Sequence, residues 1–310
     1  MCYNSCGAAV VAAPRPYNKQ KEEKKMKKLL CLALAAFMLV GMMFVTTSCD
    51  SGSPSSNGGG SSGDAGNQSS GGSTKFVCGV TEYEPMNWRE GGNWTGFDTE
   101  FALLVGEKLG LEVEFQMIEW AQKFTELNAG TIDAIWNGFT ATANEPDGTP
   151  RITLSDMSYS YMLNTQCVVV RSDRLSEISS ADDLVGLTIA AEAGSAGESK
   201  AQNLVGDSGT IIGVAQQINT FLEVMTGASD GAVVDYILAD QLTGSGDYAN
   251  LAIAFDLGPE VFAIGFRIGD PMRDRVNEVI KELYDDGTLM ELAIKYGLEN
   301  RLMLDTSFGQ

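Results

Sequence analysis

Secondary structure alternates along residues 75–139, which read KFVCGVTEYEPMNWREGGNWTGFDTEFALLVGEKLGLEVEFQMIEWAQKFTELNAGTIDAIWNGF. Short apolar runs predict three strands, at 76–80, 113–118 and 132–139. Between them, apolar spacing predicts a helix that Asp98 caps and Gly110 ends, and a second helix around 122–128. Strands that alternate with helices indicate a largely parallel sheet with helices on both faces.

The same alternation begins again further along the chain. Apolar runs predict strands at 166–170, 187–191, 210–214, 231–236 and 263–268. Helical patterns start at about Ser199, cover 219–226, and close the chain after Pro271, which suits the first helical position. The fold class is therefore α/β, and the second half of the chain echoes the first, so we expect two lobes of similar design.

Composition excludes much of the enzyme repertoire. The 310 residues include no histidine, which rules out Ser-His-Asp and Cys-His catalysis and every metal site that needs imidazole. The formal net charge of -20 argues against nucleic acid and anionic lipid headgroups as partners. We expect no cofactor, no metal and no catalytic residue.

The first part of the chain has the features of a targeting segment. Residues 29–45 read LLCLALAAFMLVGMMFV and follow two lysines, which predicts a secretory signal peptide over 26–48. The small residues before Cys49 resemble the lipobox of bacterial lipoproteins, and this resemblance implies a lipid on Cys49. An uncleaved membrane anchor is the alternative. Residues 1–25 precede a complete signal, and we interpret them as an extension from a spurious upstream start codon.

Residues 50–74 are mostly serine and glycine, which predicts a flexible tether between the lipidated Cys49 and a soluble body. The body is then held outside the cytoplasm, at the cell membrane. Two cysteines lie within this body, Cys78 and Cys167, and each belongs to an apolar strand-like run. They are either two buried free thiols or, since export permits it, a disulfide.

Four motifs stand in a recognisable order between residues 75 and 302. They are Gly96-Phe97-Asp98, Asp133-Ala134-x3-Gly138-x-Thr140, Asp230-Gly231-Ala232-Val233-Val234-Asp235 and Asp286-Gly287-Thr288-Leu289. Together they resemble the extracellular solute-binding proteins of polar amino-acid ABC transporters, the group that contains histidine-, glutamine- and lysine/arginine/ornithine-binding proteins. The resemblance implies a type II periplasmic-binding-protein-like fold, in which two α/β lobes joined by two crossing strands close on one amino acid. Lobe 1 would comprise 75–163 plus 257–310, and lobe 2 would comprise 164–256.

The family binds the ligand carboxylate with an arginine, and the resemblance assigns this role to Arg151. A planar guanidinium suits the role because it bonds a carboxylate bidentately. About six extra residues within 143–150 precede Arg151 when the chain is set against the family pattern. A surface arginine on a loop is therefore the alternative. The resemblance also places Ser195 and Ala196 at the carboxylate, in a turn that opens a helix.

The resemblance assigns the ligand ammonium to Asp235, which ends a hydrophobic run. The alternative is that Asp235 only caps the following helix. The Gly138 carbonyl and the Thr140 hydroxyl would complete the ammonium and carboxylate shells.

Three residues are expected around the ligand side chain. The resemblance places Tyr83 and Trp120 as flanking aromatic rings, and Glu192 as a carboxylate that faces the side chain. With Glu82 and Glu84 nearby, these residues favour a cationic ligand, arginine or lysine. The alternative is that the glutamates are solvated charges at the rim of a very acidic protein.

The sequence favours a non-enzymatic, monomeric binding protein that delivers a polar amino acid to ABC permease subunits. Two other functions stay open. One is a ligand-sensing module that signals through a partner. The other is a dehydratase-like enzyme on the same fold, for which Glu192 could serve as a buried acid or base.

Overall fold

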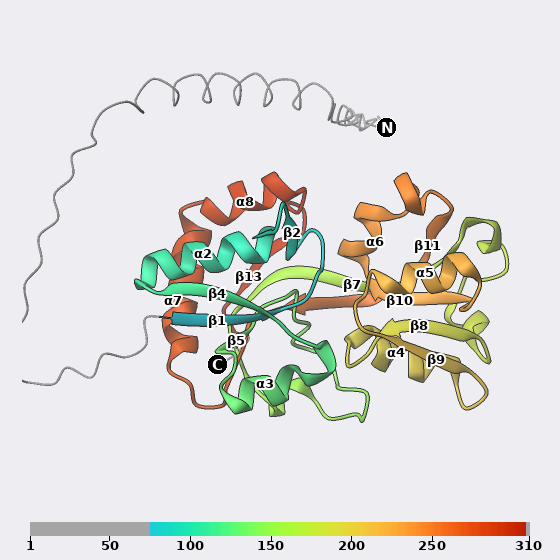
Figure 1. The fold of residues 1–310 in the computed structure, drawn as a ribbon, viewed down its shortest axis with the longest axis horizontal. Helices are drawn as coiled ribbons and strands as arrows, with labels where there is room; N and C mark the ends of the chain where they lie inside the picture. The colour runs from blue at the N-terminus through green and yellow to red at the C-terminus, as the bar shows by residue number, and fades with distance from the viewer. Residues whose placement is uncertain (1–74, 308–310) are drawn as a thin grey trace, which may run out of the picture. The chain divides into compact units, whose positions relative to one another are not determined.

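The computed structural model describes residues 75–307 (Figure 1). The expected upstream extension, signal peptide, lipidated Cys49 and tether lie outside this range. Within 75–307, none of the helices combines the length and apolar character that a membrane span requires.

The first lobe is built on a sheet with strand order β4-β1-β5-β12-β6. These strands are β1 (Lys75–Val80), β4 (Glu112–Met117), β5 (Ala134–Ile135), β6 (Asp156–Met157) and β12 (Gly265–Phe266). Its helices are α2 (Phe97–Leu109), α3 (Lys123–Ala129), α7 (Met272–Asp285) and α8 (Thr288–Tyr296). α2 and α8 lie on one side of β1 and β4, and α3 lies on the other, as expected for an α/β layer structure (Figure 1).

The second lobe is built on a sheet with strand order β11-β7-β10-β8-β9, and β13 pairs with β7. These strands are β7 (Ser160–Arg171), β8 (Thr188–Glu192), β9 (Thr210–Val214), β10 (Gly231–Asp235), β11 (Leu251–Phe262) and β13 (Leu302–Asp305). Its helices are α4 (Ala196–Val205), α5 (Asn219–Thr226) and α6 (Tyr236–Leu242). A short hairpin of β2 (Trp88–Glu90) and β3 (Asn93–Thr95) belongs to the first lobe.

Two long antiparallel strands join the lobes (Figure 1). β7 and β11 have 12 residues each and pair from Met162 opposite Phe262 to Arg171 opposite Leu251. The fold is the expected pair of α/β lobes with a two-strand hinge. The expected lobe boundaries, after residue 163 and before residue 257, fall inside these strands, and the division at those residues stays a prediction.

The sheets are mixed rather than largely parallel. β1 runs parallel to β4 and β5, but β12 is antiparallel to β5, and β10 is antiparallel to β7. The antiparallel pairs arise because the chain crosses between the lobes twice and returns in the opposite direction. The runs 132–139 and 263–268 contribute only two residues each to the sheet, in β5 and β12, and their remaining residues lie outside the strands.

Two helix starts differ from the expectation. Helix α2 begins at Phe97 after Gly96, so Asp98 is not its N-cap. The fully buried Asp98 carboxylate instead accepts hydrogen bonds from the Gly138 N–H at 2.6 Å and the Tyr161 hydroxyl at 2.8 Å. Pro271 precedes the first residue of α7 and is its N-cap.

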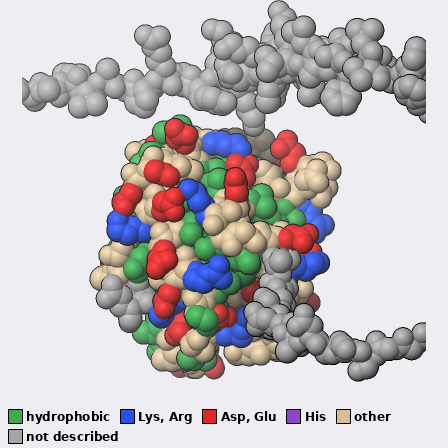
Figure 2. Space-filling model, turned by 90° about the vertical axis from the view of Figure 1, so that its left-hand side faces the viewer, with side chains coloured by type: hydrophobic (Ala, Val, Ile, Leu, Met, Phe, Trp, Pro, Cys, Tyr) green, Lys and Arg blue, Asp and Glu red, His purple; other side chains and the backbone are tan. Residues whose placement is uncertain are grey.

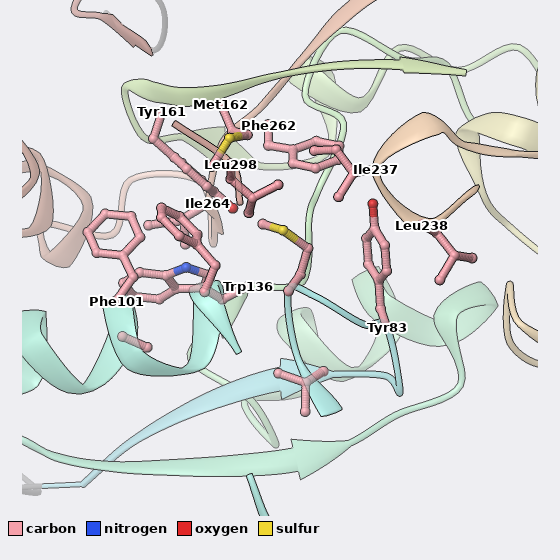
Figure 3. Packing of buried hydrophobic residues seen from close by; sticks show 14 of the residues in the cluster. Tyr83, Phe101, Trp136, Tyr161, Met162, Ile237, Leu238, Phe262, Ile264 and Leu298 are labelled. Atoms are coloured by element: carbon pink, nitrogen blue, oxygen red, sulfur yellow. The ribbon is translucent and has the colours of Figure 1, made fainter. Parts of the chain in front are cut away.

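Aromatic rings fill the core of the first lobe. The Phe101 ring meets Trp136 edge-on at 5.1 Å and Tyr161 at 5.4 Å, and Figure 3 shows these side chains together. Cys78 and Cys167 are buried free thiols on β1 and β7, so the free-thiol alternative is confirmed. On the face drawn in Figure 2, acidic and basic side chains are interspersed.

Candidate binding site

A pocket lies where segments of the two lobes meet, and charged and polar side chains make up most of its lining. Its lining residues are Trp120, Asn137, Gly138, Thr140, Arg151, Gln166, Glu192, Ser195, Ala196, Gln217 and Asp235.

The structure brings eight of the nine expected ligand-binding residues into this lining, and Tyr83 is the exception. The Tyr83 ring stands behind Gly138, since a Cβ on Gly138 would lie 2.5 Å from Tyr83 Cε1. Figure 3 shows the ring beside Ile237 and Leu238 of α6. Tyr83 thus supports the pocket wall rather than lining it.

Arg151 is 1% exposed, so the alternative of a surface arginine is wrong. Its Nη1 donates to the Thr140 carbonyl and its Nη2 to the Gly194 carbonyl, both at 3.0 Å. Its Nε donates to Glu145 at 2.7 Å. These bonds use three of the five guanidinium N–H groups, which leaves two that can reach a ligand carboxylate.

The start of α4 presents backbone N–H groups to the pocket. Ser195 is the N-cap, and its hydroxyl oxygen accepts the Glu198 N–H at 3.0 Å. The Ala196 and Gly197 N–H groups belong to the first turn, which has no intrahelical acceptors. Such a helix start attracts an anion. The assignment of Ser195 and Ala196 to the ligand carboxylate stays a prediction.

Asp235 ends β10 and lies in a cluster of amides. Its carboxylate accepts hydrogen bonds at 2.5 Å from Asn164, Gln166 and Gln217, and it makes no capping bond to α6. The alternative of a simple helix cap is therefore wrong. Burial, and then the neighbouring Glu260 carboxylate, raise the pKa of Asp235.

Glu260 on β11 adds a second buried carboxylate to this cluster. It accepts hydrogen bonds from Gln166 at 2.8 Å and Asn164 at 2.7 Å, the two side chains that also bind Asp235. The Thr140 hydroxyl donates to Glu260 at 2.9 Å, so its proton points to Glu260 in this structure. Glu260 Oε2 also lies 3.6 Å from Lys200 Nζ, which offsets part of this buried negative charge, and the remaining charge favours the approach of a further cation.

Glu192 ends β8 and is 2% exposed, so the alternative of a solvated rim charge is wrong for this residue. That alternative holds for Glu84, which is exposed, and both Glu84 and the half-buried Glu82 lie outside the pocket lining. Its Oε1 has no hydrogen-bond partner within residues 75–307. Burial first, and then the Asp235 charge, raise the pKa of Glu192 to about 8, against the opposing effect of Lys123 and Arg151. A buried acceptor without a partner carries a desolvation cost that a ligand donor would remove.

Trp120 lies in a short 3₁₀ turn before α3 and is almost fully buried. Its ring packs edge-on against Phe139, with 6.0 Å between centroids. The Lys123 ammonium lies 5.4 Å from the Trp120 ring centroid. A cation is therefore already within cation–π distance of the Trp120 ring.

Several polar residues near the ligand position were not expected from the sequence. Gln166 and Glu260 could have been found, because each is polar within an apolar strand. Lys123 and Glu145 could not be found in this way, because neither interrupts an apolar strand of the sequence. The unexpected set around the pocket is Lys123, Asn137, Glu145, Asn164, Gln166, Gln217 and Glu260.

The family model of bacterial extracellular solute-binding proteins, family 3, matches residues 76–299. The chain is 30% identical over 232 residues to the arginine-binding extracellular protein ArtP of Bacillus subtilis (strain 168), covering 74% of this chain and 88% of that protein. It is 29% identical over 218 residues to the L-cystine-binding protein TcyA of the same organism, covering 69% of this chain and 77% of that protein.

Among solved structures, the fold is similar to an ABC uptake transporter substrate binding protein from Streptococcus pneumoniae with bound histidine. The TM-score is 0.64 and the identity 30%, over 72% of this chain and 92% of that chain. The family match extends from β1 to beyond α8 and so includes both lobes and the pocket between them. The chain belongs to the bacterial extracellular solute-binding proteins, family 3.

Proposed function

We propose that the protein binds one free cationic amino acid, with L-arginine as the first candidate, in the pocket between its lobes and delivers it to an ABC permease. The observation that carries the choice of ligand is the buried Glu192 carboxylate, whose Oε1 has no protein partner within the described range.

The α-groups of an amino acid suit the two poles of the pocket. Asp235 would bind the ammonium, because a cation relieves the repulsion between its carboxylate and that of Glu260. The free N–H groups of Arg151 and the start of α4 would bind the carboxylate.

The remaining charge favours a cationic side chain. The residues that line the pocket include one cation, Arg151, and two carboxylates, Asp235 and Glu192. A zwitterionic backbone pairs with Arg151 and Asp235 and leaves Glu192 unpaired. A guanidinium or ammonium on the ligand would pair with Glu192, and the Trp120 ring would add about 0.5–2 kcal/mol.

The relatives support this ligand class but do not define it. The similar proteins include binding proteins for arginine and for L-cystine, and one whose structure holds histidine. Side chains at the pocket must therefore select the ligand within this family. Delivery to a permease, the lipid anchor at Cys49 and a monomeric state also stay predictions.

Calorimetric titration tests the proposal. The purified protein is unfolded and refolded to remove carried ligand, and is then titrated with arginine, lysine, histidine, glutamine and cystine. We expect arginine or lysine to bind at least about 100-fold more tightly than glutamine, because only a cation pairs with buried Glu192. Equal or tighter binding of glutamine, or no binding of any of them by folded protein, would contradict the proposal.

A further inference from the structure

Glu145 joins two buried cations of the first lobe. Its Oε2 lies 2.7 Å from Lys123 Nζ, and its Oε1 lies 2.7 Å from Arg151 Nε. The Lys123 and Arg151 side chains are 0% and 1% exposed, and that of Glu145 is 14% exposed. Glu145 belongs to the segment 143–150, which a bridge between Asn144 and Pro150 closes into a tight loop.

Both cations bind one oxygen atom of the second lobe. Lys123 Nζ donates to the Gly194 carbonyl at 2.8 Å, and Arg151 Nη2 donates to the same carbonyl at 3.0 Å. Gly194 lies in the turn between β8 and α4, so these bonds cross from one lobe to the other.

The lobes touch at this point through their backbones. A Cβ on Gly194 would lie 2.7 Å from the Cα of Ala121, closer than real side chains approach. Gly194 also has a φ of 74°, which disfavours other residues. A glycine here lets the Gly194 carbonyl reach the cations, and a movement of the lobes apart would break both hydrogen bonds.

Glu145 is needed because the two cations repel each other. Burial first, and then the Arg151 charge, lower the pKa of Lys123 to about 7, while Glu145 and Glu192 oppose this shift. Without the carboxylate between them, two buried like charges would face one carbonyl oxygen. The Glu145 carboxylate therefore fixes the positions of both donors.

We propose that Glu145 is a positioning residue that holds Lys123 and Arg151 on the Gly194 carbonyl, and that this clasp stabilises the closed arrangement of the lobes. The inference rests on the proposed function, since it assumes a ligand between the lobes. Glu145 and Lys123 do not line the pocket. The clasp therefore strengthens the binding of every ligand and has little effect on the choice among them.

Closure also has a proton signature. The groups that face Lys123 are Glu145, Arg151 and Glu192. A lysine exposed by opening would have a pKa near 10.4, while the buried Lys123 has a pKa of about 7. The closed state binds fewer protons between these two values, so ligand binding at pH 8 releases a proton from Lys123.

The test compares E145Q with D147N. Both variants remove one carboxylate charge from the same segment, but Asp147 is exposed and bonds Thr149 within its own turn. Dissociation constants are measured for arginine and for one weaker amino acid at pH 6, below the pKa of Lys123, where both cations of the clasp are charged. Proton release is measured at pH 8 in two buffers of different ionisation enthalpy. K123M serves as a second variant, and circular dichroism checks that each variant is folded.

We expect E145Q to weaken the binding of both ligands about 10-fold to 100-fold, with their affinity ratio unchanged within about threefold, because a glutamine cannot compensate both cations. D147N should bind as the unaltered protein does, and K123M should lose the proton release. Unchanged or tighter binding by E145Q, or a shift of the ratio beyond about tenfold, would overturn the clasp. If the folded, unaltered protein bound neither ligand, the proposed function would be overturned together with the clasp. If the unaltered protein bound its ligands and only the expectations for E145Q failed, the clasp alone would be overturned.

Discussion

Glu192 is the residue whose ionisation links stability to ligand binding. Its pKa of about 8 in the folded protein is above the ordinary 4.5, chiefly because it is buried. The folded state therefore binds more protons than the unfolded state between these values. As far as this group is concerned, the stability of the closed arrangement is highest below pH 4.5 and falls as the pH rises through 8.

The variant E192Q should separate the two effects. At pH 8 we expect the free energy of unfolding of the closed arrangement to rise by about 1–3 kcal/mol, because one pKa unit corresponds to about 1.4 kcal/mol. Arginine affinity should fall about 10-fold to 100-fold, because the charge partner is lost. Urea denaturation and calorimetry measure the two changes. The matched control is E107Q, on the exposed face of α2, which should change neither quantity. If E192Q kept the arginine affinity of the unaltered protein, the role of Glu192 would be contradicted.

Gly138 shows how little space the pocket wall allows. It has a φ of 56°, and a Cβ would lie 2.5 Å from Tyr83 Cε1 and 3.1 Å from Phe262 Cε2. G138A should lower both stability, by about 1–3 kcal/mol, and ligand affinity. G148A controls for backbone strain, since Gly148 has a φ of 87° with no atom within 4 Å of a Cβ. Equal thermal shifts in the two variants would contradict the steric argument.

Among the elements, the start of α4 combines a structural and a binding role. S195A removes the hydroxyl that accepts the Glu198 N–H, so it should cost about 1 kcal/mol of stability. It should also weaken ligand binding up to about 10-fold, through loss of a hydroxyl donor. S180A removes a comparable cap, at the 3₁₀ turn Ala181–Leu184 outside the pocket lining, and should reduce stability alone. Matching affinities of S195A and the unaltered protein would remove Ser195 from the site.

The elements also show what the sequence could predict and why the rest was missed. β10 was found because its residues are apolar and buried on both faces. The sequence does not predict β11, because Gly258-Pro259 is typical of a turn. The structure tolerates Pro259 within this strand because β11 lies at the edge of its sheet. Asp98 was expected as a cap because residue type alone does not reveal its partners, which lie 40 and 63 residues further along the chain.

The same reasoning applies to the site. Arg151 and Asp235 were found because the family pattern marks them, and the structure places both in the pocket lining. Lys123 could not be found, because its burial depends on the Gly194 carbonyl, 71 residues away in the other lobe. Contacts between lobes leave no local periodicity in the sequence, so only the structure reveals them.

For the whole molecule, Gly194 and Ala121 mark a close backbone approach between the lobes. G194A should keep the lobes apart, because the added Cβ would lie 2.7 Å from Ala121 Cα. We expect arginine affinity to fall more than about 100-fold, and arginine to reduce the radius of gyration less than in the unaltered protein. Small-angle X-ray scattering measures the radius. G206A, with a φ of 66° and open space around its Cβ, is the control. Normal ligand-induced compaction of G194A would contradict closure at this point.

In the proposed function, buried carboxylates between the lobes recognise a cationic side chain. Citrulline has nearly the shape of arginine but carries an uncharged ureido group, so a calorimetric comparison of the two ligands isolates the charge. We predict that the unaltered protein binds arginine at least about 100-fold more tightly than citrulline, a difference of about 2.7 kcal/mol. Affinities that agree within about threefold would contradict recognition of the side-chain charge by Glu192.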